Sequence, residues 1–147
     1  MSTFRVSASA EVEAAPADVY AVFADYHQKH PAILPKGFTL ILESGGTGAG
    51  TVFRLETKAL GSTRAYRMAV TEPEPGRLLM EAEIGGGVVT TFRVEPLGPR
   101  RASVTITSDF PRRPGILGGV EAALVRAVAG AQFRQELRNL AALLARG

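Results

Sequence analysis

Two histidines, His27 and His30, are the residues of this 147-residue sequence best suited to acid–base or metal chemistry. Imidazole titrates near neutral pH, and histidines three positions apart on a helix can share one face. A metal site needs a third ligand, and nothing except Asp25 stands nearby at a useful spacing. We therefore predict no metal site and keep His30 as a weak candidate for a catalytic acid or base. The alternative is that both histidines flank a helix end, either exposed or capping it.

Two glycine-rich runs, GGTGAG at 45–50 and GGG at 85–87, invite comparison with phosphate-binding loops. Neither fits, because no GxGxxG precedes a helix and no Lys-Ser or Lys-Thr pair follows. Apolar alternation typical of strands flanks both runs, and glycine is the residue that hairpin turns favour. We predict two hairpins and no nucleotide or other cofactor.

Other catalytic arrangements receive little support from the pattern. Glu81 and Glu83 alternate with apolar residues, so they are expected to face solvent, which argues against a paired-carboxylate mechanism. No serine stands in a nucleophile-elbow context. The sequence has no cysteine, which excludes disulfides and thiolate metal sites.

The charge pattern argues against a nucleic-acid partner. The formal net charge is +3, and basic residues are concentrated only at 100–101 and 112–113, without the interleaved aromatics of a binding stripe. The start of the chain shows no signal-peptide pattern. The longest helical apolar segment is broken by Arg126 and is expected to be shorter than the ~18 residues of a membrane span, so no span is expected. We predict one domain over residues 1–147, located in the cytoplasm.

Apolar and polar residues alternate over most of the chain, as in half-buried strands. Strands are predicted near residues 4–12, 38–43, 51–57, 64–70, 78–84, 88–94 and 104–110, with helical structure between residues 16 and 30. Turn signals separate consecutive strands and predict an antiparallel meander.

One long helix is predicted from residue 114 to residue 146. Its first half is apolar on the side of Val120 and Val128, whereas its second half is apolar on nearly the opposite side, around Leu137 and Leu140. Either the helix bends near Gly130, or its first half packs on another element such as the 16–30 region. A dimer contact on the remaining face is the further alternative.

Several segments resemble the START-like superfamily, also called SRPBCC, which includes birch-pollen-allergen-type and polyketide cyclase/dehydrase-type proteins. They are EVEAAPADVYAVFADYHQKHP, ESGGTGAGTVFR, VTEPEPGRLLME, VTTFRVEP and QFRQELRNLAALLA. The resemblance spans nearly the whole chain. It implies an α+β helix-grip fold, in which a seven-stranded curved antiparallel sheet, with two short helices after its first strand, wraps around a long C-terminal helix. It also implies an apolar cavity between sheet and helix, which family members use for lipids, sterols, polyketides or hormones.

Strand phase and the resemblance together select the residues expected to line that cavity. They are Phe23, Phe53, Leu55, Arg64, Tyr66, Met68, Thr90, Phe92, Ile106, Ser108, Leu124 and Val128. Tyr66, Thr90 and Arg64 would orient the polar end of a ligand, although an arginine at such a position can also extend to solvent. The alternative is that the large side chains fill the interior and leave no cavity.

The function predicted from these features is binding of a small hydrophobic or amphiphilic molecule by a monomer or homodimer. The entrance is expected among the 45–50 hairpin, the 31–37 loop and the first half of the terminal helix. One alternative is a cyclase- or dehydratase-type enzyme in which His30 or Tyr66 moves a proton. The other is a partner-binding regulatory module with a filled interior and an exposed apolar patch around residues 120–131.

Overall fold

The computed structural model describes residues 2–59 and 61–146, and the elements within these ranges match the predicted architecture. In order they are β1 (Thr3–Val12), α1 (Pro16–Ala24), α2 (Lys29–Ile33), β2 (Phe38–Ser44), β3 (Val52–Ala59), β4 (Ser62–Glu74), β5 (Leu78–Glu83), β6 (Val89–Gly98), β7 (Arg101–Pro111) and α3 (Gly115–Ala145). Seven strands, two short helices and one long helix within the described residues confirm the predicted helix-grip fold.

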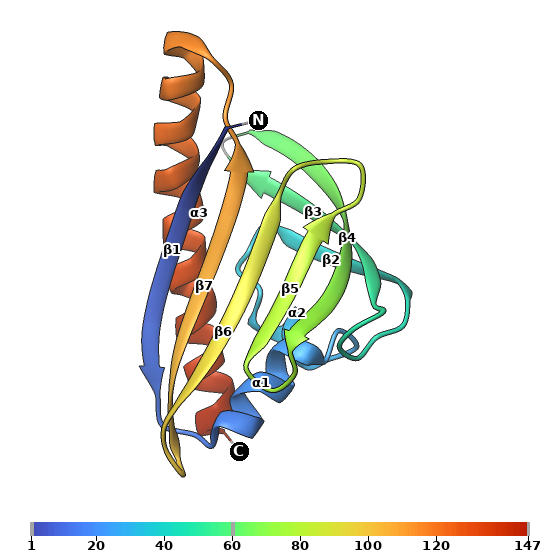
Figure 1. Cartoon of the computed structure of the whole chain (residues 1–147), viewed down its shortest axis with the longest axis vertical. Helices are drawn as coiled ribbons and strands as arrows, with labels where there is room; N and C mark the ends of the chain where they lie inside the picture. Colours follow the sequence, from blue (N-terminus) through green and yellow to red (C-terminus); the bar gives the residue numbers. More distant parts are fainter. Residues whose placement is uncertain (1, 60, 147) are drawn as a thin grey trace.

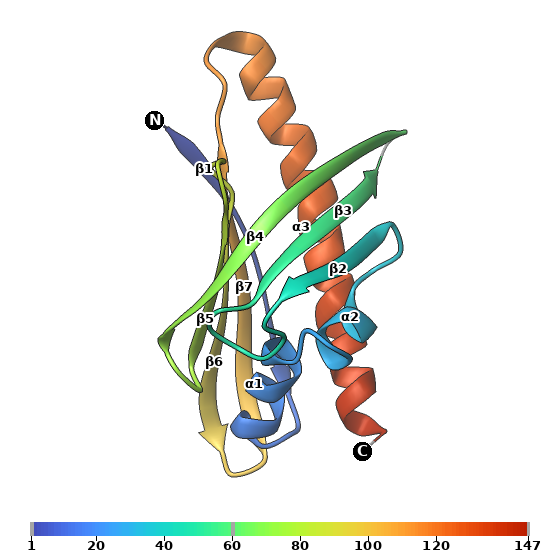
Figure 2. The same ribbon diagram turned by 90° about the vertical axis from the view of Figure 1, so that its right-hand side faces the viewer.

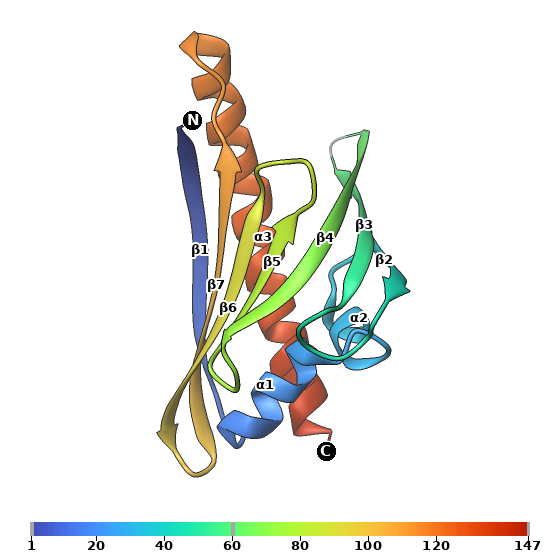
Figure 3. The ribbon, with the colours of Figure 1, turned by 45° about the vertical axis from the view of Figure 1, so that its right-hand side comes forward.

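The strands form an antiparallel sheet in the order β1-β7-β6-β5-β4-β3-β2. Hairpins connect β2 through β7 as a meander, and β1 pairs with β7, the last strand. The sheet curves strongly, with α3 lying along its hollow side (Figures 1 and 2). The short helices α1 and α2 cover the end of the hollow that lies near the C-terminus (Figure 3).

The β1–β7 pair shows why these residues form strands. Val6 and Ala8 are buried against the inner face, and their partners in β7 are Ser108 and Ile106. On the outer face the hydroxyls of Ser9 and Thr105 share a hydrogen bond of 3.0 Å. Alternating inner apolar and outer polar residues stabilise a sheet of which one face is packed and the other is wet.

Helix α1 begins with Pro16 in its first turn and carries Asp18 near its positive end, as predicted. It ends at Asp25, whose side-chain oxygens accept hydrogen bonds from the backbone N–H groups of His27, Gln28 and Lys29. These bonds turn the chain directly into α2, so both short helices stay packed under the sheet.

Helix α3 differs between its two halves. In the second half Leu137 and Leu140 are buried, and the Asn139 amide donates a 2.9 Å hydrogen bond to the Ile33 carbonyl next to α2. In the first half Ala122 and Ala129 pack with Phe4 of β1, whereas most larger side chains are exposed. The suggestion that the first half packs on the 16–30 region is therefore wrong, because those helices cover the second half.

Length and composition alone would allow α3 to cross a membrane. An 18-residue window of the helix has a mean hydropathy of 1.3, so the expectation that no apolar segment is long enough is wrong. The position of α3 on the hollow side of the sheet, with Leu137 and Leu140 in the core, is that of the central helix of a helix-grip fold.

Candidate functional site

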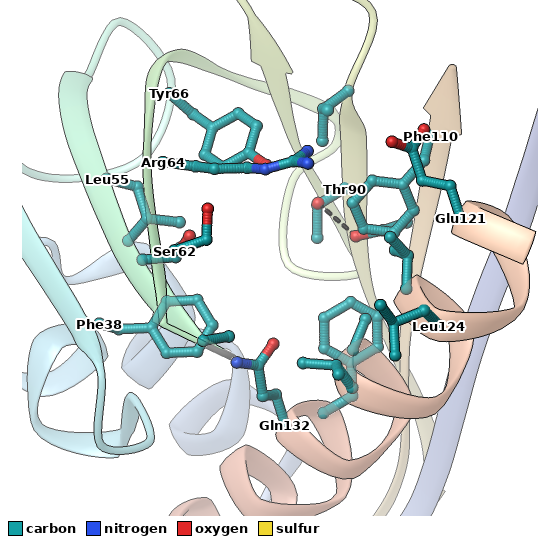
Figure 4. Close-up of a pocket in the computed structure, with 18 of the residues that line it drawn as sticks. Phe38, Leu55, Ser62, Arg64, Tyr66, Thr90, Phe110, Glu121, Leu124 and Gln132 are labelled. Atoms are coloured by element: carbon teal, nitrogen blue, oxygen red, sulfur yellow. Dashed lines mark hydrogen bonds between the residues drawn. The ribbon is translucent and has the colours of Figure 1, made fainter. Parts of the chain in front are cut away.

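A cavity of about 560 Å³ lies between the hollow face of the sheet and α3 (Figure 4). Its volume falls within the range of roughly 300–1,000 Å³ that small-molecule sites occupy. The alternative of an interior filled by side chains is therefore wrong. The walls come from β2 to β7 on one side and from the first half of α3 on the other.

Eight of the twelve residues predicted to line a cavity do so. They are Leu55, Arg64, Tyr66, Met68, Thr90, Ser108, Leu124 and Val128. As predicted, Thr90 and Ser108 share the inner face of neighbouring strands, where their hydroxyls lie 2.5 Å apart and share a hydrogen bond. In Figure 4 the side chains of Tyr66 and Arg64 from β4 extend toward the open space opposite α3.

Phe23, Phe53, Phe92 and Ile106 do not line the cavity, so this part of the prediction is wrong. They are buried in the packed core. The ring of Phe23 in α1 stacks on Phe92 with centroids 4.7 Å apart, and Phe53 stacks on Tyr26 at 5.0 Å. Since α1 and the turn after it fill one end of the hollow, inward-facing residues at that end become core.

The open end of the cavity lies at the far end of β4 and the first half of α3. Arg64 and Leu124 line the cavity and are exposed. Arg113 lies beside them, and its Nε is 3.6 Å from Oε1 of Glu121. The predicted entrance is thus correct for the first half of the terminal helix.

The predicted entrance is wrong for the glycine-rich 45–50 hairpin. The Tyr26 N–H donates a 2.8 Å hydrogen bond to the Gly46 carbonyl, and the Gly48 N–H donates to the Ala24 carbonyl at 2.9 Å. A Cβ on Gly46, whose φ is +143°, would stand 2.0 Å from Nε2 of His27. Glycine is required here because the hairpin docks closely on the turn after α1. Among the described residues, neither the hairpin nor the 31–37 loop lines the cavity.

Four polar residues meet at the inner end of the cavity. They are Tyr26 from the turn after α1, His30 from α2, Glu81 from β5 and Glu136 from α3, and all four are buried. The Tyr26 hydroxyl donates a 2.6 Å hydrogen bond to Oε2 of Glu81. Of the four, Glu81 is the residue that lines the cavity, so we call this group the Glu81 cluster.

His30 faces the Glu136 carboxylate of the Glu81 cluster. Its Nδ1 lies 2.7 Å from the Phe23 carbonyl, which can only accept, so Nδ1 carries the hydrogen. Its Nε2 faces Oε2 of Glu136 at 3.7 Å, an ion pair rather than a short hydrogen bond. Within the described residues, that oxygen of Glu136 has no hydrogen-bond partner.

Burial and neighbouring charge shift the protonation of the Glu81 cluster. Burial raises the pKa of Glu81 to about 7, and the Glu136 carboxylate adds to the effect, although His30 and Tyr26 oppose it. Burial alone lowers the pKa of His30, but Glu136, Glu81 and the Phe23 carbonyl more than offset this, so the pKa is raised. Burial, followed by the charge of Glu81, raises the pKa of Tyr26. A carboxyl group able to exchange a proton near neutral pH therefore faces the cavity.

The expectation that Glu81 faces solvent is wrong. Strand β5 turns Leu79 and Glu81 inward, because Glu81 pairs with Val70 of β4 and with Thr90 of β6, both of which face the interior. Adjacent apolar residues at 78 and 79 make both phases of this strand plausible from sequence. Counting from a three-residue turn at 85–87 would pair Thr90 with Ala82, whereas the structure pairs it with Glu81, so the turn does not identify the phase either.

The histidines also differ from the expectation. His30 is buried and does not line the cavity, so both the exposed and the ligand-facing interpretations of it are wrong. His27 is exposed beside the glycine-rich hairpin. Over residues 2–59 and 61–146, no group of three His, Asp or Glu side chains is arranged to hold a metal ion.

Comparison with solved structures identifies the same architecture elsewhere. The solution structure of the KanY protein superposes with a TM-score of 0.86 at 22% identity, covering 99% of both chains. The Zhui aromatase/cyclase from Streptomyces sp. R1128 gives 0.78 at 18% identity, covering 99% of this chain and 95% of that one. A START superfamily protein from Mycobacterium smegmatis gives 0.71 at 18% identity, covering 99% of both.

The sequence itself carries the family assignment. No curated protein is significantly similar to the chain. The profile of one family, described as polyketide cyclase / dehydrase and lipid transport, matches residues 3–145, which include the whole sheet and α3. The chain therefore belongs to the polyketide cyclase/dehydrase and lipid transport family.

Proposed function

We propose that this protein binds a small apolar or amphiphilic molecule in the cavity between its sheet and α3. The observation that carries the proposal is the cavity of about 560 Å³, whose lining is mainly apolar, as at Leu55, Met68 and Val128. Enclosure removes apolar ligand surface from water, which stabilises the complex by roughly 25 cal/mol per Å². Membership of a family named for polyketides and lipids supports the same ligand class.

Polar groups are few and lie at particular places on the cavity wall. The Thr90–Ser108 hydroxyl pair and Tyr66 lie along it, and Arg64 lies at the open end. We expect these groups to orient a ligand rather than to supply most of the affinity. The cytoplasmic location expected from the sequence accords with this proposal and stays a prediction.

The test combines native mass spectrometry of the purified protein with thermal shifts across fatty acids, sterols and polycyclic aromatic compounds. We expect a retained ligand or a clear upward shift with at least one class. Val128→Trp places a large ring in the cavity and should abolish the response. Ala127→Trp is the matched control, because residue 127 is exposed on the same helix. No co-purified molecule and no shift with any class would refute the proposal.

An enzyme acting in the same cavity is the second candidate, favoured by the Glu81 cluster. A carboxyl with a pKa of about 7 at the cavity wall suits general acid–base catalysis near neutral pH. The similar Zhui structure is named an aromatase/cyclase. In such an enzyme Glu81 would transfer the proton, and not His30 or Tyr66 as expected from the sequence. Turnover of a polyketide-like substrate that is lost in Glu81→Gln, while the fold survives, would establish it.

The partner-binding module fits less well. It required a filled interior, and the cavity contradicts that requirement. The exposed apolar residues of α3 that it also required are present, at Ile116, Leu117, Val120 and Leu124. Of these, Leu117, Val120 and Leu124 also line the cavity, so ligand enclosure accounts for them in part.

A further inference from the structure

The Glu81 cluster has more hydrogen-bond acceptors than donors. The Tyr26 hydroxyl is engaged with Oε2 of Glu81, and the Nδ1–H of His30 is engaged with the Phe23 carbonyl. The remaining donor, Nε2 of His30, faces Glu136 at 3.7 Å. None of these three donors is directed at a ligand in the cavity.

Carboxylate oxygens of the Glu81 cluster remain without a hydrogen bond from the described residues. No hydrogen bond from a described residue reaches Oε1 of Glu81, and Glu81 lies on the cavity wall. Oε2 of Glu136 is buried, and no described residue donates to it. The cost of a buried acceptor without a donor, about 1–3 kcal/mol, falls on this oxygen of Glu136, which does not line the cavity. Oε1 of Glu81 is not among the buried unpartnered atoms, and a hydroxyl of a ligand in the cavity would supply it with a donor.

We propose that the inner end of the cavity recognises a hydroxyl group of the ligand, and that this hydroxyl donates a hydrogen bond to Oε1 of Glu81. This inference rests on the proposed function. The ligand class is therefore a hydroxylated aromatic or aliphatic molecule whose apolar body lies against Met68 and Phe133. The hydroxyl enters first, because Tyr26 and His30 of the Glu81 cluster come from the α1–α2 segment, which closes the end of the hollow away from the exposed mouth (Figure 3).

The two ends of the cavity differ in charge and favour this orientation. The mouth carries the guanidinium groups of Arg64 and Arg113, which are donors only, and the Glu121 carboxylate there is paired with Arg113, so the mouth favours acceptor or anionic groups. The inner end carries carboxylates and disfavours an anion. An amphiphile with a hydroxyl at one end and an acceptor at the other matches both ends.

Recognition by Glu81 couples binding to protonation. The groups that face Glu81 are Tyr26, His30 of α2 and Glu136 of α3, while Tyr66 and Arg64 line the same cavity from β4. A hydroxyl that donates to Glu81 favours the ionised carboxylate. Affinity should then be low in acid, rise as Glu81 ionises around pH 7, and level off above it. Binding near pH 7 should release a fraction of a proton.

The experiment compares 1-naphthol with 1-methylnaphthalene, two probes of nearly equal size of which one can donate. Binding is measured at pH 5.5 and pH 8 to the whole protein and to Glu81→Gln. At pH 8 the unaltered protein should prefer 1-naphthol by about tenfold, since a hydrogen bond to a charged group contributes about 1.5–3 kcal/mol. At pH 5.5 most of this preference should disappear. Glu81→Gln should show no pH dependence of the preference.

The matched control is Glu56→Gln, because that carboxylate pairs with Arg54 on the outer face of the sheet and should leave both affinities unchanged. Calorimetry of 1-naphthol binding at pH 7 in phosphate and in Tris gives a second readout that needs no variant. Different apparent enthalpies in the two buffers would report the released proton.

The outcomes separate this inference from the function on which it rests. Equal binding of both probes with no pH dependence would overturn hydroxyl recognition and leave enclosure standing. A preference for 1-naphthol that persists in Glu81→Gln with its pH dependence intact would also overturn it. If neither probe binds, the inference falls, and the co-purified-ligand and thermal-shift results then decide enclosure independently.

Discussion

The first half of α3 is the more apolar half in sequence, yet it is the half that neighbouring elements cover less. In the second half Leu140 is fully buried under α1 and α2, and Glu136 belongs to the Glu81 cluster. In the first half Ile116 is 87% exposed and Leu117 is 84% exposed, and the helix extends past the end of the sheet (Figure 2). Coverage by neighbouring elements, rather than the apolar content of the helix, decides which half is core and which half borders the cavity.

Truncating a leucine in each half gives the largest expected difference. Leu140→Ala should lower the free energy of unfolding by about 3 kcal/mol, because it leaves a cavity in packed core. Leu117→Ala should change it by less than about 0.5 kcal/mol, because that side chain is exposed. Urea denaturation of both variants measures the difference. Similar losses from the two would contradict the distinction between the halves.

The pH dependence of stability also distinguishes the two halves of α3, because the buried titrating groups, Glu81 and His30, lie beside the second half. The folded-state pKa of Glu81, about 7, lies above the ordinary glutamate value of 4.5, so the folded protein binds this proton more tightly than the unfolded chain does. Stability from this group is present at low pH and is lost as pH rises toward 7, by about 2 kcal/mol between pH 5 and pH 7.5. The raised pKa of His30 acts in the same direction, with its contribution lost as pH rises above 6.5.

Denaturation curves at several pH values check this slope. Glu81→Gln should flatten it and leave the protein more stable than the unaltered chain at pH 7.5. Glu121→Gln, in the first half of α3, should leave the slope unchanged, because that carboxylate is only partly buried and lies beside Arg113. A slope that survives Glu81→Gln would mean that other groups control it.

Two adjacent glycines in the first half give the smallest expected effect, and the two effects have opposite signs. A Cβ on Gly118 would lie 1.9 Å from the Arg113 carbonyl oxygen, so Gly118→Ala should destabilise by about 1–2 kcal/mol through backbone displacement. A Cβ on Gly119 meets only the Arg112 side chain at 3.8 Å, so Gly119→Ala should stabilise by about 0.5–1 kcal/mol. Melting temperatures of the two variants measure these effects. A higher melting temperature for Gly118→Ala would show that the backbone at Arg113 does not hold this end of α3 in place.

Much of the fold could be predicted from the sequence because period-two alternation and turn residues act locally. The alternation of apolar and polar residues in β4, β6 and β7 shows directly which side chains face inward. It placed Tyr66, Thr90 and Ser108 on the cavity wall. The phase of β5 could not be read in the same way, because its apolar residues include both 78 and 79 and its inner face carries glutamates.

The Glu81 cluster could not be predicted because four separate elements build it. His30 was expected at a helix end, and nothing in the pattern around Tyr26 or Glu136 distinguishes them from other positions. Their approach depends on how α1 and α2 close one end of the hollow, which is a property of the tertiary packing. For the same reason Phe23 and Phe92 became core rather than cavity wall.

The pairing of β1 with β7 has a consequence for biosynthesis. Arg5 and Asp109, which pair across these strands at 2.8 Å, are 104 positions apart in the chain. Contacts between such distant segments slow folding, because a long loop must close before they form. We expect β1 to remain unpaired until nearly the whole polypeptide has left the ribosome. The sheet is completed only then.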